Sequence, residues 1–498
     1  MNIITEQFDS KRSWIALGLL LIAITSIYAW HLDMPYFGDD YQQVYYNPLH
    51  SATAYFFGRP PFAERYIPIQ TMVLSLSQWI SGPNTWLIRV FNIVIATLVC
   101  WLTWQLALRL GLSMRGAVIA AGFVAVSQVA GTAVLMNDSP SQILSTLAGL
   151  IALVAAFEYS RSNNRLYLLG ILGGIILGFL SKETFVGWFI PILILVSLRY
   201  DGSRWHLRGI RSILVSGVPI LLFFAAYIKF HSSIGLPNGT FGMDRYNLRI
   251  GPNILFNAAQ LLFAVLLPLS TVWVYVAIAH RAIGMEIAAG LCVAIMSAIA
   301  LGGFWRLRKV WFIVLFGAIG SISPVIFLNH VGELYAYSIL PFVALLFATG
   351  CESLMRSKQI TRLVVAFLVV VTTLNLWSVY SKQSMMVTEG QLHRTLLPQL
   401  QSIAARLPNK SRLYLVNPVR SGDEYSVFLT RGFHLFDFGE NAVGTPIGRN
   451  DIDTKVVEED ALDSIMRVSP GVAVTYDTTT LKVRILGQSD GREAALVP

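Results

Sequence analysis

Long apolar segments constrain this chain more than any other feature of its sequence. They recur over most of its 498 residues, and a helix needs roughly 20 mostly apolar residues to cross a bilayer. The composition agrees, because 55% of the residues are hydrophobic and only 13% are charged, whereas soluble domains carry about 25% charged residues. The sequence therefore predicts an all-α polytopic membrane protein.

Apolar runs place the predicted spans. A shorter apolar segment, 67–81, is predicted to lie in the membrane interface. Loop 229–252 is predicted to lie outside, whereas Arg306, Arg308 and Lys309 place 305–309 in the cytoplasm. An odd number of crossings is therefore required between 252 and 305, although only two apolar blocks are visible. Either Pro268 divides the first block into two short passes, or one block is re-entrant, which gives about 13 or 11 spans, with 13 preferred. The predicted spans are 13–30, 86–108, 116–134, 142–159, 166–181, 184–198, 212–228, 253–279, 284–304, 310–328, 334–350 and 363–381.

Basic residues set the orientation. Lys and Arg accumulate in cytoplasmic loops of membrane proteins, and here they fall in alternate loops. The N-terminus is therefore predicted to be cytoplasmic, and loop 31–85 to lie outside. The net charge of +9 is explained in this way, without nucleic acid. The basic residues used are Lys11, Arg12, Arg109, Arg115, Arg161, Arg165, Arg199, Arg204, Arg208 and Arg211.

The composition changes after the last predicted span. Residues 388–498 are polar, with short alternating runs at 412–417, 472–476 and 481–486 that predict strands. Residues 392–407 predict a helix that Pro398 could interrupt. We expect a transmembrane domain over 1–387 and a small extracytoplasmic α/β domain over 388–498.

Two adjacent acids in the first outer loop are the strongest functional signal. Asp39 and Asp40 follow the first span within an aromatic-rich stretch. An interfacial loop explains the aromatic residues, but it does not explain two neighbouring carboxylates. Their mutual repulsion raises the proton affinity of one of them, which suits a general base.

Three further polar motifs are predicted to face the same side of the membrane. Lys182 and Glu183 form a charged turn between two spans, and ionisable residues at membrane depth are often functional. Glu333 and Tyr335 lie in another short outer turn. Asp138 stands before a span, where a helix-capping role is the simpler interpretation. Because structural ion pairs would fall on both faces, the common sidedness favours one shared cavity.

The order of these motifs resembles the GT-C superfamily of membrane glycosyltransferases. The nearest branch is the protein O-mannosyltransferase type, which uses dolichyl- or polyprenyl-phosphate-mannose, with its bacterial homologues. The resemblance covers roughly residues 30–345 and is expected to bring a GT-C-like fold. The matching segments are Phe37-Gly38-Asp39-Asp40, Tyr66-Ile67-Pro68-Ile69, Arg89-Val90-Phe91-Asn92, Ser181-Lys182-Glu183 and Glu333-Leu334-Tyr335-Ala336-Tyr337.

This resemblance implies an inverting transfer of a sugar from a polyprenyl-phosphate-linked donor to an acceptor hydroxyl. Asp39 would be the general base and Asp40 would orient the acceptor, or the reverse. Ile67 and Leu334 replace arginines of the relatives, so other outer cations are expected to bind the donor phosphate. The donor site is assigned to Lys182, Arg65, Arg245, Glu183, Glu333 and Tyr335, and the acceptor site to Asp138 and Tyr66.

Partners and location follow from the same scheme. The expected partners are a polyprenyl-phosphate sugar and a lipid, glycan or protein acceptor, with no nucleic acid. No cofactor is required, and no metal ligand set is assigned, although the acid pair leaves a divalent ion open. The expected location is a bacterial inner membrane, with the active site outside. Two alternatives remain open, namely a lipid-linked glycan transporter or flippase, and a glycan polymerase or ligase.

Overall fold

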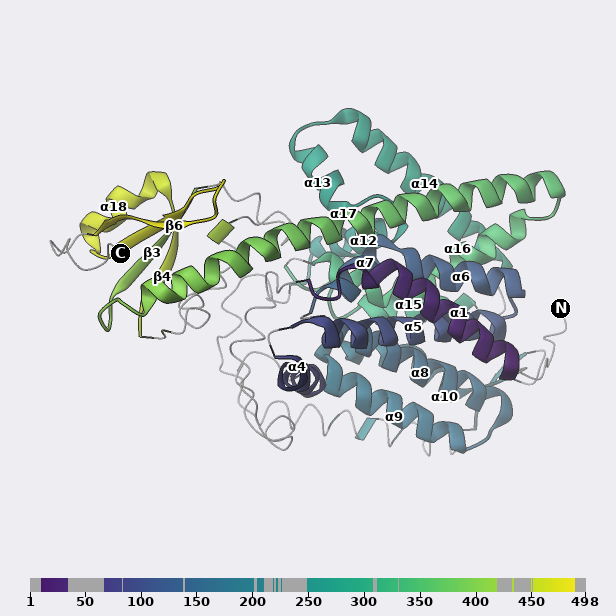
Figure 1. Ribbon diagram of the computed structural model, residues 1–498. Helices are drawn as coiled ribbons and strands as arrows, with labels where there is room; N and C mark the ends of the chain where they lie inside the picture. Colours follow the sequence, from purple (N-terminus) through teal and green to yellow (C-terminus); the bar gives the residue numbers. More distant parts are fainter. Residues whose placement is uncertain are drawn as a thin grey trace.

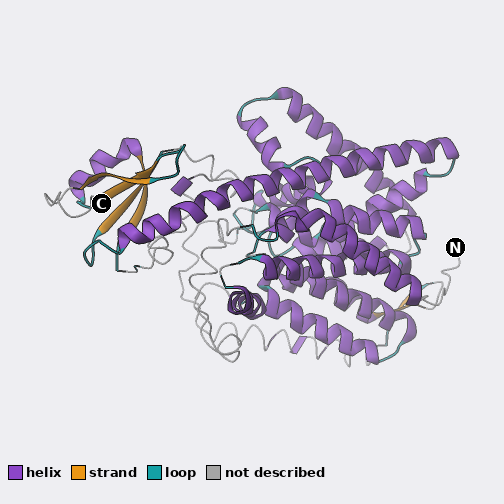
Figure 2. Cartoon of the chain, viewed as in Figure 1, coloured by secondary structure: helices purple, strands orange, loops and turns teal. Residues whose placement is uncertain are grey.

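The computed structural model divides into a large helical part and a small sheet domain, joined by one long helix (Figure 1). The structure describes residues 10–34, 67–82, 84–137, 139–200, 204–209, 218, 221–222, 225, 249–307, 311–329, 331–418, 432–433, 449 and 451–488. Helices make up almost all of the larger part (Figure 2). The predicted class, a helical membrane protein with a small C-terminal α/β region, is confirmed.

The helical part contains these elements. In chain order they are α1 (Ser10–Tyr28), η1 (Ala29–His31), α4 (Pro68–Ser81), α5 (Trp86–Arg109), α6 (Met114–Val126), α7 (Gln128–Leu135), α8 (Pro140–Ser162), α9 (Leu166–Ser181), η2 (Glu183–Trp188), α10 (Phe189–Ser197), β1 (Leu198–Tyr200), β2 (Trp205–Leu207), α12 (Asn253–Leu266), α13 (Thr271–Ala279), α14 (Ile283–Arg306), α15 (Trp311–Ile322), η4 (Glu333–Ser338), α16 (Leu340–Leu354) and α17 (Lys358–Ala404).

Four of the described helices are long and apolar enough to cross a bilayer by themselves, namely α5, α8, α14 and α17. Two bent pairs, α6 with α7 and α12 with α13, qualify as broken spans, and shorter apolar helices pack among them. The most buried of the four is α8, whose most apolar window is 83% buried. It packs against α5, α9 and α10. At Gly174 of α9, an added Cβ would lie 2.8 Å from the Ala148 carbonyl oxygen, so this close helix contact requires glycine.

The block predicted at 253–279 is not a straight span. Helices α12 and α13 meet at 119° across a break that contains Pro268. Proline lacks the N–H that a helix interior needs and clashes with the preceding turn. The chain therefore breaks at Pro268, and the bend of 119° fits either of the two predicted alternatives, two short passes or a re-entrant segment. The predicted segment 212–228 lies largely outside the described residues.

Helix α4 lies across the other helices. Figure 1 shows it end-on, whereas α5 and α8 run across the view. Its buried side includes Gln70 and Ser75, while Leu76 and Trp79 are exposed. A helix with polar residues inside and apolar residues outside suits an interfacial position, as predicted for 67–81.

Helix α17 continues from the membrane part into the sheet domain (Figure 1). The sequence predicted a span and a separate helix interrupted at Pro398, whereas the structure has one helix of 47 residues with Pro398 inside it. The predicted domain boundary at 387/388 falls within this helix.

The small domain is a four-stranded sheet in the order β4-β3-β5-β6. Strand β3 (Arg412–Asn417) is parallel to β4 (Asp453–Glu458) and β5 (Val472–Tyr476), and β6 (Val483–Gln488) is antiparallel to β5. Alternate strand residues face opposite sides, so Leu413 and Leu415 pack on the end of α17. Tyr414 and Val416 pack on α18 (Leu462–Val468), which follows η7 (Glu459–Ala461).

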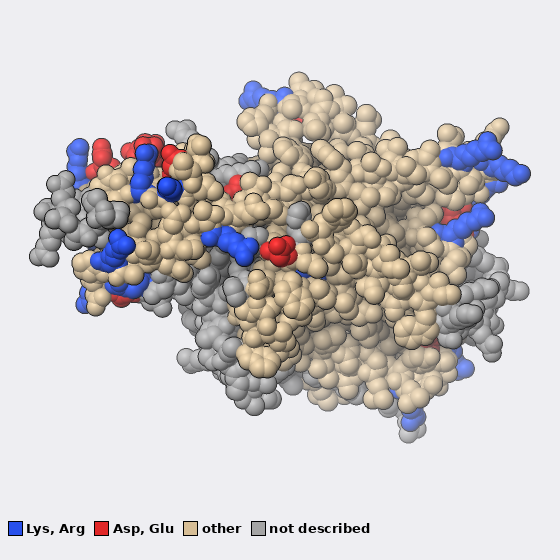
Figure 3. All heavy atoms as spheres, in the orientation of Figure 1, with Lys and Arg blue, Asp and Glu red and all other residues tan. Residues whose placement is uncertain are grey.

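Charged side chains are distributed unevenly over the helical part (Figure 3). On the face shown, Lys and Arg gather at the end farthest from the sheet domain, near the turn between α16 and α17. Arg356, Lys358 and Arg362 are exposed there. A broad band of uncharged atoms separates this end from the sheet domain. Under the positive-inside rule, this end is predicted to lie in the cytoplasm.

Candidate functional site

Hydrogen bonds fix the described ends of loop 31–85, which the sequence predicts to lie outside. Thr85 Oγ1 donates to the backbone oxygen of Met34 at 2.5 Å, and it also lies 3.2 Å from that of Leu32. Met34 is buried. The chain is next described from Ile67, whose carbonyl accepts bonds from Thr71 at the start of α4. The acid pair, Asp39 and Asp40, lies outside the described residues, as do Arg65 and Tyr66.

Two polar residues of α5 hold the connection between α7 and α8. Arg89 Nη1 donates to the carbonyl of Leu135 at 2.8 Å. Asn92 Nδ2 lies 3.2 Å from the carbonyl oxygens of both Val134 and Met136. The last carbonyls of a helix lack intrahelical donors, and here side chains of α5 supply the missing N–H donors. The motif at 89–92 therefore positions the backbone that leads to residue 138.

The N-terminus of α8 is tied to two other parts of the site. The backbone N–H of Ser141 donates to Gln70 Oε1 of α4 at 3.2 Å. Gln142 Nε2 donates to Ser338 Oγ of η4 at 2.5 Å. These bonds connect the start of α8, next to the predicted motif at residue 138, with α4 after the motif at 66–69 and with η4, which carries the motif at 333–337. Asp138 itself lies outside the described residues.

Two of the predicted site residues meet directly. Lys182 Nζ lies 4.8 Å from the centre of the Tyr335 ring, within the range of a cation–π contact. Lys182 is only 4% exposed, which strengthens such a contact. Glu183, the next residue, begins η2. Its Oε2 atom is buried, and no hydrogen-bond partner reaches it among the described residues.

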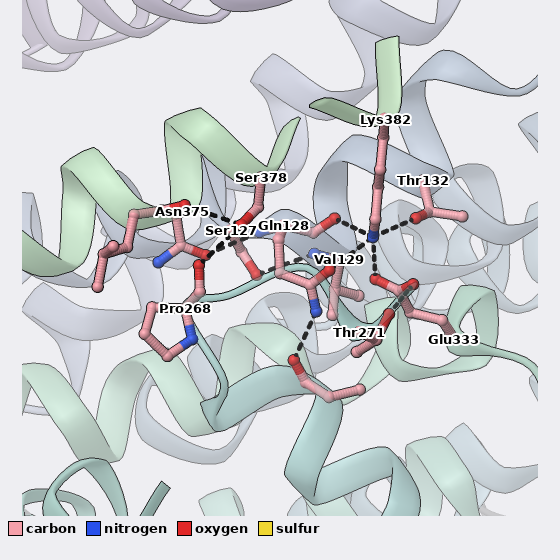
Figure 4. A network of polar contacts seen from close by, with 12 residues as sticks. Ser127, Gln128, Val129, Thr132, Pro268, Thr271, Glu333, Asn375, Ser378 and Lys382 are labelled. Atoms are coloured by element: carbon pink, nitrogen blue, oxygen red, sulfur yellow. Dashed lines mark hydrogen bonds and ion pairs between the residues drawn. The ribbon is translucent and has the colours of Figure 1, made fainter. Parts of the chain in front are cut away.

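Glu333 pairs with a lysine that the sequence reading did not single out. Lys382 Nζ lies 2.5 Å from Glu333 Oε1, and the other carboxylate oxygen, Oε2, accepts from Thr271 Oγ1 at 2.6 Å. Lys382 also contacts Gln128 and Thr132 (Figure 4). In the sequence, Lys382 follows the last predicted span and resembles an ordinary flanking cation. Only the fold shows that it points inward.

This network joins the two helix breaks. Asn375 Oδ1 of α17 accepts from the backbone N–H of Gln128 at the start of α7. Ser378 Oγ lies 3.2 Å from the Pro268 carbonyl between α12 and α13. Gln128 Nε2 donates to the carbonyl of Ala264 in α12. Polar side chains of α17 thus satisfy backbone groups that the broken helices leave open, as Figure 4 shows.

A small cavity of about 110 Å³ adjoins the network. It lies between α12, α13 and the turn before η4, and most of its lining is apolar. Thr271 and Glu333 provide polar groups at its wall. Ligand pockets usually enclose about 300–1,000 Å³, so the volume of this cavity does not by itself mark a ligand site. Its lining residues are Gln260, Leu261, Phe263, Ala264, Thr271, Val272, Val274, Tyr275, Ile278, Val331, Gly332 and Glu333.

The structure therefore describes four of the predicted site residues, namely Lys182, Glu183, Glu333 and Tyr335. It brings Lys182 to Tyr335, and it pairs Glu333 with Lys382. Arg245, assigned to the donor site, lies outside the described residues. The described part of the chain contains no group of three or more His, Cys, Asp or Glu side chains arranged to hold a metal ion.

Comparison with known proteins agrees with this architecture. The model of the family described as dolichyl-phosphate-mannose-protein mannosyltransferase matches residues 66–228. The crystal structure of ArnT from Cupriavidus metallidurans in the apo state is 11% identical, with a TM-score of 0.54 over 95% of this chain and 94% of that chain. ArnT bound to undecaprenyl phosphate is 12% identical, with a TM-score of 0.51 over the same shares of each chain, 95% and 94%.

The oligosaccharyltransferase of Archaeoglobus fulgidus, tethered with an acceptor peptide, is 12% identical, with a TM-score of 0.46 over 82% of this chain and 62% of that chain. A search of curated protein sequences finds no match. The predicted resemblance to the GT-C glycosyltransferases is confirmed by the family match and by the shared fold with ArnT.

Proposed function

We propose that this chain is a membrane glycosyltransferase. It transfers a sugar from a polyprenyl-phosphate-linked donor to an acceptor hydroxyl on the extracytoplasmic side. The family match and the fold shared with ArnT support the general class. ArnT has been solved with undecaprenyl phosphate, which supports a polyprenyl phosphate as the carrier.

The contact between Lys182 and Tyr335 carries the proposal. It joins two motifs that lie far apart in the sequence and that were both assigned to the donor site, with Nζ 4.8 Å from the ring centre. An ammonium carries N–H donors and a positive charge, and cations of this kind stabilise the negative oxygens of a phosphate. Lys182 therefore suits a site for a lipid phosphate, with the Tyr335 ring packed against its ammonium.

The remaining roles follow from the chemistry of an inverting displacement. Asp39 takes the proton of the acceptor hydroxyl as its oxygen bonds to the anomeric carbon. The bond from that carbon to the phosphate oxygen breaks, and the lipid phosphate leaves with the electron pair. Lys182, with Arg65 and Arg245, stabilises the leaving phosphate. Glu183 Oε2, which has no hydrogen-bond partner among the described residues, accepts a hydrogen bond from a sugar hydroxyl, and Asp40, Tyr66 and Asp138 orient the acceptor.

The test is the Asp39→Asn variant, purified and supplied with lipid-linked sugars and with extracts of acceptor. An amide cannot take the proton, and loss of a general base costs about 10²- to 10⁴-fold in rate. We expect transfer to fall by that factor, with a normal apparent Tm. Intact-mass comparison of acceptors from cells with and without the variant would identify the sugar by its lost mass increment.

Asp33→Asn is the matched control. Asp33 is exposed and lies at the start of the same predicted loop, outside the acid pair, so transfer should be unchanged. Near-normal turnover in Asp39→Asn, with loss in Asp40→Asn, would reverse the roles within the pair. Normal turnover in both variants would contradict an acid pair as the catalytic base.

A further inference from the structure

Lys382 is a buried cation whose ammonium group is surrounded by oxygen acceptors. Its side chain is 0% exposed. Nζ lies 2.5 Å from Glu333 Oε1 and 2.5 Å from Gln128 Oε1. The Thr132 hydroxyl is 3.0 Å away and the Gln128 carbonyl oxygen 3.2 Å away. An ammonium has three N–H donors, so these oxygens occupy all of them.

The partner carboxylate is held from both sides. Glu333 Oε1 meets Lys382 of α17, and Glu333 Oε2 accepts from Thr271 of α13 at 2.6 Å. Figure 4 shows Thr271 and Lys382 approaching the carboxylate from different helices. Leu334, the next residue, carries no charge. Among the ion pairs between described residues, Lys382 is the only cation of Glu333.

The held carboxylate is the first residue of η4, which also carries Tyr335. A 3₁₀ turn places residues two apart on a short, stiff segment, so fixing Glu333 limits where the Tyr335 ring can lie. The Tyr335 ring lies against Lys182, which follows the last residue of α9. A connected path therefore runs from Lys382 through Glu333 and Tyr335 to Lys182.

We propose that Lys382 is a positioning residue, which fixes the η4 turn through Glu333 so that Tyr335 meets Lys182. It does not contact the reacting atoms. Its place in the transfer reaction rests on the proposed function, but its effect on the turn does not. A purely structural ion pair would stabilise the bundle without changing the environment of Tyr335.

The experiment places a fluorinated tyrosine at position 335 of the full chain and records its ¹⁹F resonance without any substrate. Lys182→Met calibrates the signal, because removing the cation above the ring shifts the resonance. We expect Lys382→Met to produce a shift of at least half that size. Lys358→Met, on the same helix but at an exposed position, should leave the resonance unchanged.

Lys382→Met leaves Glu333 with no cation among the described residues and could prevent folding. A second variant keeps the proposal testable in that case. Lys382→Met combined with Glu333→Gln removes both charges, and we expect it to recover the apparent Tm while the Tyr335 resonance stays displaced. An undisplaced resonance in this folded double variant would overturn the proposal. Because no substrate is used, failure of the transferase assignment would leave this result interpretable.

Discussion

Single polar residues inside the helical part act mainly on backbone. Arg89 and Asn92 illustrate this, because both donate to carbonyls at the end of α7. Their spacing was visible in the sequence and matched a family motif, but their targets were not. A sequence lists the donors of a helix, whereas the acceptors depend on which helix end the fold brings alongside.

Asn92→Leu should therefore damage the site from a distance. The variant leaves the carbonyls of Val134 and Met136 without the Nδ2 donor, and a buried polar group without a partner costs about 1–3 kcal/mol. We expect a lower apparent Tm and a reduced transfer rate, because the connection to residue 138 loosens. Thermal unfolding in detergent and a transfer assay measure both effects.

Thr97→Val provides the comparison on the same helix. Thr97 is also buried, but its hydroxyl donates to the carbonyl of Ile93 in its own helix. Its loss should change the apparent Tm by less than the loss of Asn92. Equal losses in the two variants would contradict a special role for the contact between α5 and α7.

At the scale of elements, the sequence predicted helices and strands better than breaks. Residues 412–417 and 472–476 are strands as predicted, and β6 begins two residues later than expected. Strand β4 was not predicted. The bend at Ser127, where α6 and α7 meet at 54°, lies inside the predicted span 116–134, which has no proline and whose nearest glycines, Gly122 and Gly131, are not at the bend. The bend could not be predicted from this segment, because the hydrogen bond that stabilises it comes from Asn375 in the distant helix α17.

The joint between α17 and the sheet domain contains a buried histidine. His393 lies beyond the predicted span 363–381, where α17 packs on the sheet. Burial lowers the pKa of His393 to about 3 from 6.5, while a hydrogen bond with the Gly432 backbone acts in the opposite direction. Glu389 of α17 and Tyr476 of β5 are also buried in this domain. Burial, followed by the charge of Glu389, raises the pKa of Tyr476 to about 12.

A pH dependence follows from His393. Its folded pKa lies below the unfolded value, so the unfolded chain binds the proton first as the pH falls. The contribution of neutral His393 to the free energy of unfolding is therefore fully present above about pH 6.5 and declines as the pH falls toward 3. His393→Gln should flatten this decline in thermal unfolding of the sheet domain between pH 7.5 and 4.5. The exposed His206→Gln variant should keep it, and an unchanged slope in His393→Gln would argue against His393 as the group responsible.

At the scale of the whole molecule, α17 connects the site with the sheet domain. Lys382 and His393 are separated by eleven helical residues, or about 16 Å at 1.5 Å per residue. Both side chains are fully buried, one against the membrane helices and the other against the sheet. Sequence analysis predicted both parts but separated them near residue 388. A continuous helix cannot be recognised from hydropathy, because its apolar pattern ends where the membrane ends.

The continuous helix makes the orientation testable. If the positive-inside assignment holds, the turn at the start of α17 lies in the cytoplasm and the sheet domain lies outside. Single cysteines at exposed positions 359 and 478 can report this, as Gln359→Cys and Thr478→Cys in a background without Cys100, Cys292 and Cys351. In spheroplasts, a membrane-impermeant maleimide should label Thr478→Cys and leave Gln359→Cys unlabelled until the membrane is opened. The reverse pattern would place Lys182, Tyr335 and Glu333 on the cytoplasmic side, since α17 would keep its direction relative to them. Labelling of both positions in intact spheroplasts would mean that α17 does not cross the membrane.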